Sequence, residues 1–337
     1  MLEYIRGATP FLNASCHTLA EDETCSIVRI SDIGGEGMMT FYKVLPGICV
    51  LYNDFHMSSC ESNFHPGFDM LCIDHCREGR LEQEVEDGGY TYFEAGELKV
   101  DRRIRHTGHM RMPTKHFHGI SVVFDMKEAS KSLPEAMAGF PVDLYHIQQK
   151  YCDDKHPFVI RGVPEIKHIF SELYTIPLKI REYYLRVKIL ELLLFLDALE
   201  FSDENRESRP YFYKAQVEKV NAVHKLLIQD IENRYTLNEL SKRFDIPLTT
   251  LKTCFRSVYG NSIFAYMRSY RMNHAANLLR EHKELSIATI AGMVGYDSPG
   301  KFSSAFKEVI GSTPSFYRKH SVHMENLWPD GEDIKQK

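Results

Sequence analysis

The apolar residues of the chain follow two different periods, and the change falls near residue 141. From about Ser26 to Asp125 the sequence consists of short β-prone segments, such as MMTFYKVL, ICVLYNDFHM, DMLCIDHC, YTYFEAGELKV and ISVVFDM. Turn dipeptides such as Pro46-Gly47 and Gly88-Gly89 separate them. Many short strands broken by such turns are typical of a β-sandwich or barrel. We therefore predict a β-rich domain over residues 1–141.

Residues 142–201 carry a helical period instead. Two short apolar stripes are formed by Leu144, Ile147 and Tyr151 and by Ile166, Ile169, Phe170 and Leu173. Pro177 then opens a long helix through Leu199, because proline is tolerated in a first turn. Apolar residues crowd more than one side of this helix: Ile180, Tyr183, Tyr184, Val187, Leu190, Leu194 and Ala198. Such a helix must be covered, either entirely within the chain or also by a second copy in a homodimer, which we expect.

A polar, proline-terminated stretch, SDENRESRP at residues 202–210, separates these helices from a basic segment. Residues 211–320 hold 16 Lys and Arg against 9 Asp and Glu, a balance of +7. The net charge of the whole chain is −5, which leaves −12 for the rest. This distribution favours a nucleic-acid partner for the last third of the chain.

The basic segment contains the same helical pattern twice, at residues 236–260 and 286–311. In the first copy Thr236 and Glu239 form a capping-box pattern, and a second helix runs from about Pro247 to Tyr259, with Gly260 as its stop. The second copy repeats the apolar positions at an offset of 50, which becomes 51 after one inserted residue. Residues 262–282 read as one connecting helix. The pattern predicts two helix-turn-helix motifs in an all-helical domain over residues 211–320, followed by a tail at 321–337.

The sequence RMNHAANLLREHKELSIATIAGMVGYDSPGKFSSAFKEVIGSTPSFYRKH resembles the C-terminal signature of the AraC/XylS family of bacterial transcription regulators. The resemblance implies a regulator that binds promoter DNA, with RNA polymerase as a further partner if it activates transcription. The rest of the chain resembles the family only in layout, a β-rich, cupin-like sensor domain followed by helices that often dimerise. The expected fold is thus α+β and multidomain, and the implied control is by an unidentified small-molecule effector.

The same resemblance implies which residues contact DNA. Base contacts fall at the positions of Thr249, Lys252, Thr253, Gly300, Lys301 and Ser304. Lys252 and Lys301 suit donation to guanine, and Arg256 and Lys307 suit phosphate. For any one of these residues, the alternative to a DNA contact is a solvated surface position. Pro299 and Gly300 offer little to a base edge, so we expect the second motif to contribute more through shape and backbone contact.

The N-terminal half is rich in His and Cys, which raises the question of a metal. His116 and His118 share a strand face, but the spacing implies no third ligand, and we assign no metal or cofactor. The cupin enzyme pattern, in which a Glu follows such a His pair, is absent, so we expect no enzyme. Fold analogy instead suggests a ligand pocket lined by Tyr92, Phe93, Arg102, Arg103, His116 and His118. The two arginines would suit an anionic ligand, although an exposed loop reads equally well.

Three alternatives for the whole chain remain open at this stage. The first is a ligand-controlled DNA-binding regulator. The second is a cupin-type metal-dependent enzyme or metal sensor fused to a DNA-binding domain, and the third is an interaction protein without a small ligand. The N-terminal sequence MLEYIRGATPF lacks a signal-peptide pattern, and the apolar run 189–199 contains Glu191 and Asp197 and is too short to span a bilayer. We therefore expect a cytoplasmic protein, in which the eight cysteines are reduced.

Overall fold

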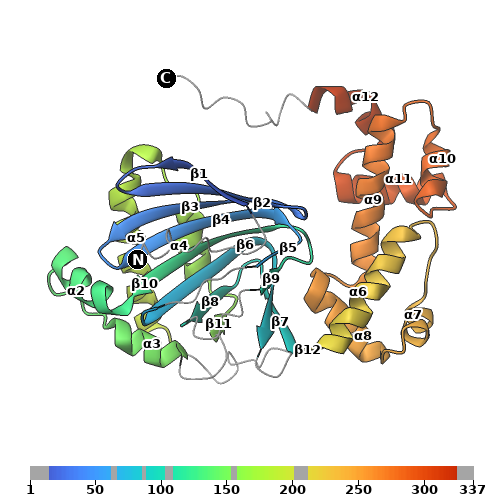
Figure 1. Ribbon diagram of the computed structural model, residues 1–337. Helices are drawn as coiled ribbons and strands as arrows, with labels where there is room; N and C mark the ends of the chain where they lie inside the picture. The colour runs from blue at the N-terminus through green and yellow to red at the C-terminus, as the bar shows by residue number, and fades with distance from the viewer. Residues whose placement is uncertain are drawn as a thin grey trace. The chain divides into compact units, whose positions relative to one another are not determined.

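The computed structural model describes residues 15–61, 67–85, 89–102, 109–152, 158–200 and 212–324. The chain divides into two compact units, residues 1–213 and 214–337 (Figure 1). The predicted linker at 202–210 lies outside the described residues. Among the helices in the described ranges, none combines the length and apolar character needed to cross a membrane.

The N-terminal unit is built on one antiparallel sheet, with the strand order β1-β2-β3-β4-β10-β6-β7-β12. β8 and β9 also pair with β6, β11 pairs with β8, and β5 pairs with β9. The strands are β1 (Ser15–Glu21), β2 (Cys25–Asp32), β3 (Gly35–Leu45), β4 (Ile48–Met57), β5 (Ser59–Glu61), β6 (Met70–Val85), β7 (Gly89–Glu94), β8 (Leu98–Asp101), β9 (His109–Arg111), β10 (Phe117–Asp125), β11 (Phe158–Ile160) and β12 (Phe212–Tyr213).

All five predicted β-prone segments contain strands. β1 was not predicted, because its residues are almost all exposed and the strand lies at the edge of the sheet, where little apolar sequence is needed. The turn at Pro46-Gly47 is confirmed: it separates β3 from β4, and Gly47 has φ +77°.

The two faces of the sheet are both buried, but against different partners. In its centre Val122 of β10 lies opposite Val50 of β4 and Ile73 of β6, and these three side chains belong to the large core beneath the helices. We call this the helix-covered face. The other face, which we call the concave face, carries two smaller apolar clusters that include Leu51 and Phe117.

Among the described residues of the N-terminal unit, four α-helices and one short 3-10 helix accompany the sheet, and in Figure 1 α4 and α5 lie behind it. They are α2 (Met126–Ala136), α3 (Leu144–Cys152), α4 (Pro164–Leu173), η1 (Leu178–Ile180) and α5 (Arg181–Ala198). The two predicted stripes are confirmed as the buried faces of α3 and α4. α5 buries a face that includes Leu185, Ile189 and Leu192. Tyr183 and Val187, from the predicted apolar set, are instead 68% and 58% exposed.

The C-terminal unit is entirely helical in its described part. Its helices are α6 (Lys214–Gln229), α7 (Leu237–Arg243), α8 (Leu248–Tyr259), α9 (Ile263–Glu281), α10 (Ile287–Met293), α11 (Pro299–Ile310) and α12 (Pro314–Met324). α12 continues past residue 320, where we placed the start of the tail. α9 connects the two helix pairs as predicted.

The internal repeat has equal helix lengths in the structure. α7 and α10 have 7 residues each, and α8 and α11 have 12 each. At corresponding points of the two bends the backbone turns left-handed, at Asp245 (φ +46°) and at Gly295 (φ +74°). Gly260 and Gly311 end the second helices, both at φ +85°. The repeat in the sequence is therefore a repeat of backbone geometry.

Candidate functional site

The outward face of α8 is polar and carries positive charge. Thr249, Lys252, Thr253 and Arg256 are all exposed, and their spacing of three and four residues puts them on one side of the helix. The opposite side, with Leu251, Cys254, Phe255, Val258 and Tyr259, is buried. α8 contains no acidic residue. The Thr253 hydroxyl donates to the backbone oxygen of Thr249 at 2.9 Å.

The outward face of α11 carries Gly300, Lys301, Ser304 and Lys307, all of them exposed. Its buried side consists of Phe302, Ala305 and Phe306. Ser298 caps the helix by accepting from the Lys301 backbone N–H, with Pro299 in the first turn. An acidic residue, Glu308, flanks this face and pairs with Arg268 of α9, with 2.9 Å between Arg268 Nη1 and Glu308 Oε1. The second face thus has fewer polar side chains and a carboxylate beside it.

Both helix pairs are held by local signals that can be read in the sequence. Thr236 and Glu239 form the predicted capping box, in which each side chain accepts from the backbone N–H of the other residue. In the second pair Ser286 accepts from the Thr289 backbone N–H at 2.9 Å.

Two arginines, one in α9 and one in the segment between α6 and α7, join this segment to the second half of the unit. Arg271 of α9 donates to the backbone oxygens of Ile231 (3.0 Å) and Asn233 (2.7 Å). Burial, followed by repulsion from Arg234, lowers the pKa of Arg271. Arg234 donates to the backbone oxygen of Gly295 at 2.9 Å. Since a hydrogen bond to a charged group contributes about 1.5–3 kcal/mol, these contacts join the two helix pairs firmly.

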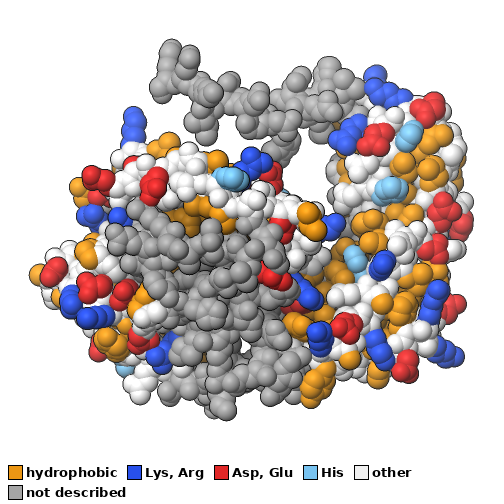
Figure 2. Space-filling view, viewed as in Figure 1, with side chains coloured by type: hydrophobic (Ala, Val, Ile, Leu, Met, Phe, Trp, Pro, Cys, Tyr) orange, Lys and Arg blue, Asp and Glu red, His pale blue; other side chains and the backbone are white. Residues whose placement is uncertain are grey.

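Charges of both signs are intermingled on one face of the C-terminal unit. On the face that Figure 2 shows, Lys and Arg side chains alternate with acidic ones over the C-terminal helices. The excess of positive charge in this segment can therefore attract an anionic partner mainly where acidic residues are few, as on the outward face of α8.

Comparison with known proteins identifies this unit. A family profile described as a helix-turn-helix domain matches residues 240–320. A protein named as an AraC-like transcription regulator in Streptomyces antibioticus is 35% identical over 96 residues, which are 28% of this chain and 31% of that protein. The C-terminal unit belongs to the AraC family. The resemblance found in the sequence is confirmed for this AraC-type domain.

Other relatives match the same part of the chain. The Msm operon regulatory protein of Streptococcus mutans is 34% identical over 100 residues, 30% of this chain and 36% of that protein. Among solved structures, the C-terminal domain of AraT, a response regulator from Geobacillus stearothermophilus, is 26% identical with a TM-score of 0.29. The match covers 35% of this chain and 93% of the AraT chain. The chain spans about a third of the length of the two curated relatives.

Of the six predicted ligand residues of the N-terminal unit, the five that the structure describes do not gather at one place. The Tyr92 hydroxyl donates to Glu82 at 2.7 Å, whereas Phe93 packs in an apolar cluster of the concave face. Arg102 pairs with Asp69 at 2.9 Å, and Arg103 lies outside the described residues. His116 and His118 lie near the end of the sheet, His116 against His56 and His118 against Tyr174.

Sequence reasoning missed a buried polar chain on the concave face. Lys99 is 0% exposed, and its Nζ lies 3.0 Å from Asp74 Oδ2. Ser121 donates to Asp74 Oδ1 (2.7 Å) and accepts from Asn53 Nδ2 (3.2 Å). These residues come from β8, β6, β10 and β4, so only strand pairing brings them together. A buried charge pair of this kind is costly unless it is well paired or used for binding.

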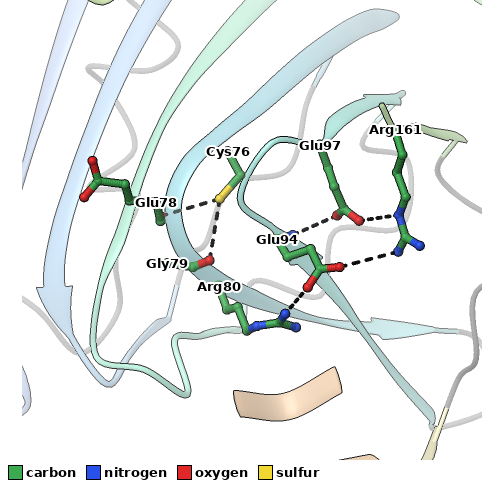
Figure 3. Close-up of polar contacts among 7 residues, drawn as sticks. All are labelled: Cys76, Glu78, Gly79, Arg80, Glu94, Glu97 and Arg161. Carbon is green, nitrogen blue, oxygen red and sulfur yellow. Dashed lines mark hydrogen bonds and ion pairs between the residues drawn. The ribbon is translucent and has the colours of Figure 1, made fainter. Parts of the chain in front are cut away.

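A second polar network, shown in Figure 3, ties strand ends to one another. Arg161 donates to Glu97 Oε1 at 2.5 Å and approaches Glu94 at 3.9 Å, and Arg80 pairs with the same Glu94. Glu97 also accepts from the Glu94 backbone N–H at 2.8 Å. Positive and negative charges alternate in this network, so its ion pairs hold β6, β7, β8 and the end of β11 together.

Cys72, Cys76 and His75 are poor candidates for metal binding. Cys72 and Cys76 belong to different apolar clusters, and burial raises the pKa of Cys76 to about 12, so its thiolate is disfavoured. His75 points to the helix-covered face, where its ring stacks on Phe170 with centroids 4.3 Å apart. Burial lowers the pKa of His75 to about 4.

Proposed function

We propose that this chain is a transcription regulator that binds promoter DNA through its AraC-type domain. The outward face of α8 carries the proposal, because it combines Lys252 and Arg256 with two threonines and no acid. In this proposal Lys252 donates to guanine edges and Arg256 contacts phosphate. The relatives that match this domain are named as regulators, which supports a role without catalysis.

The second helix pair is proposed as a weaker reader of sequence. Lys301 and Ser304 offer polar atoms, and Lys307 suits phosphate, but Gly300 has no side chain. Glu308, on the flank, would repel a phosphate and is held by Arg268. This arrangement supports recognition by shape and backbone contact more than by base edges.

Gel-shift and anisotropy titrations of the full chain test this proposal, with DNA obtained by binding-site selection. Lys252→Ala should weaken binding to the selected site by about 1–3 kcal/mol, and Arg256→Ala should also lower the salt dependence of binding. Lys225→Ala is the matched control, since this exposed lysine of α6 lies outside α8 and α11. Absence of salt-sensitive binding, or an equal loss in the control, would contradict the assignment.

For the N-terminal unit we propose control by a small-molecule effector bound on the concave face. The buried pair Lys99 and Asp74 supports this, and the Lys99 ammonium lies 5.5 Å from the ring centre of Phe93, one of the predicted ligand residues. A thermal-shift screen of metabolites is the test: an effector at 100 times its Kd should add about 2.7 kcal/mol to stability. A hit that stabilises the Lys99→Met variant equally would place the effector elsewhere.

We further propose that the regulator is a homodimer formed through α5. Tyr183, Val187 and Leu194 leave an exposed apolar strip along this helix, continued by Leu178 and Ile180. Sedimentation equilibrium of Val187→Glu against wild type should show a shift towards monomer, while Leu19→Glu on the edge strand β1 should leave the association unchanged. If wild type is monomeric throughout, this part of the proposal fails.

RNA polymerase is the expected further partner if the regulator activates transcription. The proposed compartment is the cytoplasm, where promoter DNA is available.

A further inference from the structure

Three side chains at one end of the β4–β10 pair converge on the helix-covered face. Asp54 and His56 lie two residues apart on β4 and so point to the same side. β10 pairs antiparallel with β4, with Phe117 opposite Phe55 and His118 opposite Asp54. His116 directly precedes β10 and lies beside His56, with ring centres 4.8 Å apart. The strand register therefore assembles a group that no local stretch of sequence contains.

The donor atoms of this group are close enough to share one ion. His56 Nε2 lies 3.1 Å from Asp54 Oδ1, and one ligand atom from each of the three residues lies within 4.8 Å of the other two. Two imidazole nitrogens and one carboxylate oxygen are a ligand set suited to zinc and similar divalent metals. Ligand atoms about 2.0–2.2 Å from a common ion lie at most about 4 Å apart, so small side-chain rotations suffice.

The surroundings of the group also suit a cation. A fourth donor, Glu78 Oε2, lies 3.6 Å from His116 Nε2 and can orient that ring or bind the ion directly. Two carboxylates, Asp54 and Glu78, thus face the two imidazoles. Arg77 lies 3.5 Å from Glu78 and offsets part of this negative charge. The side chains of Asp54, His56 and His116 are 47%, 61% and 29% exposed, so an ion can enter from solvent and keep water ligands.

We propose that Asp54, His56 and His116 form a binding site for one divalent transition-metal ion, with zinc as the fitting occupant. The site lies on the face opposite to the buried Lys99 pair, so it is distinct from the proposed effector site. The proposal concerns metal binding alone and stands whether or not the chain binds DNA.

Titration of the full-length, metal-stripped chain with Co²⁺ and then Zn²⁺ tests the site. We expect one Co²⁺ per chain, visible absorption bands from a nitrogen and oxygen ligand set, and displacement by Zn²⁺. His56→Ala and His116→Ala should each weaken binding by about tenfold or more, because even outer-shell changes cost about 10–100-fold. Asp54→Asn, which keeps the shape of the side chain, should weaken it as well.

His168→Ala provides the matched control. His168 lies 3.6 Å from the carboxylate of Glu172 on the same unit, but no second imidazole completes a site there among the described residues. This variant should bind Co²⁺ as wild type does, and circular dichroism will show that each variant is folded. Unchanged stoichiometric binding by His56→Ala and His116→Ala would overturn the proposal. So would a thiolate-to-cobalt charge-transfer band, or no binding by wild type at micromolar Co²⁺.

Discussion

Gly295 allows a direct test of how the two halves of the AraC-type domain are joined. Its φ is +74°, and a Cβ built on it would lie 2.4 Å from the backbone oxygen of Glu232. Gly311 has the same left-handed backbone, at φ +85°, but a Cβ there would meet nothing within 4 Å. The two glycines therefore separate the cost of backbone strain from the cost of a steric contact.

The expected magnitudes follow from this difference. An alanine held in the left-handed region costs about 1–2 kcal/mol, which is the whole effect expected for Gly311→Ala. In Gly295→Ala the backbone must also move away from Glu232, and overpacking of this kind costs about 1–3 kcal/mol more. The same movement stretches the hydrogen bond from Arg234 to the Gly295 oxygen. Gly295→Ala should thus destabilise the domain by about 2–5 kcal/mol.

Urea unfolding of the full chain, followed by far-ultraviolet circular dichroism, measures both variants. Hydrogen exchange with mass spectrometry should assign the loss of protection in Gly295→Ala to α10 and to the segment between α6 and α7. Equal destabilisation by the two substitutions, or a larger effect of Gly311→Ala, would show that the Gly295–Glu232 approach does not constrain the domain.

Three further outcomes are expected. In binding-site selection, Lys252→Ala should relax sequence preference more than Lys301→Ala, and an equal or reversed effect would remove the proposed asymmetry. The lowered pKa of His75 means that the unfolded chain, in which this histidine has a pKa of about 6.5, binds more protons than the folded one. Stability is therefore full above pH 6.5 and falls by roughly 2–4 kcal/mol towards pH 4, and urea midpoints of His75→Phe should lose this part of the pH dependence. Asp74→Asn should cost about 3–5 kcal/mol, because it removes the nearer of the two carboxylates beside buried Lys99 and leaves only Asp101 at 4.0 Å. Adding Lys99→Met should restore part of the loss in a double-mutant cycle.

The helices of the C-terminal unit were predictable because their signals are local. Thr236 with Glu239 marks a helix start, and Gly260 and Gly311 mark two helix ends, each within a few residues of the feature it controls. The internal repeat also helped. The second helix pair repeats the apolar positions of the first at an offset of 50 and then 51 residues, so the assignment of each pair could be compared with the other.

The sites of the N-terminal unit depend on strand pairing, and sequence alone does not fix the register. His116 and His118 were recognised as sharing a face, but Asp54 and His56 come from a strand about sixty residues earlier and meet them only through the β4–β10 register. The described members of the predicted ligand set do not converge for a different reason: residues adjacent on a strand, such as Tyr92 and Phe93, point to opposite faces of the sheet. For α5 the apolar pattern predicted crowding but not which side the sheet would cover.

The contacts of Arg271 have a consequence for the DNA that the proposed regulator binds. α9 has 19 residues, about 28 Å at 1.5 Å per residue, and Arg271 fixes it to the segment that precedes the first helix pair. With both pairs held on one rigid rod, the distance between their two contact points on a duplex is set by the protein. A promoter element with five extra base pairs between these points would turn the second one to the far side of the double helix, so the spacing of the element should be as invariant as its bases.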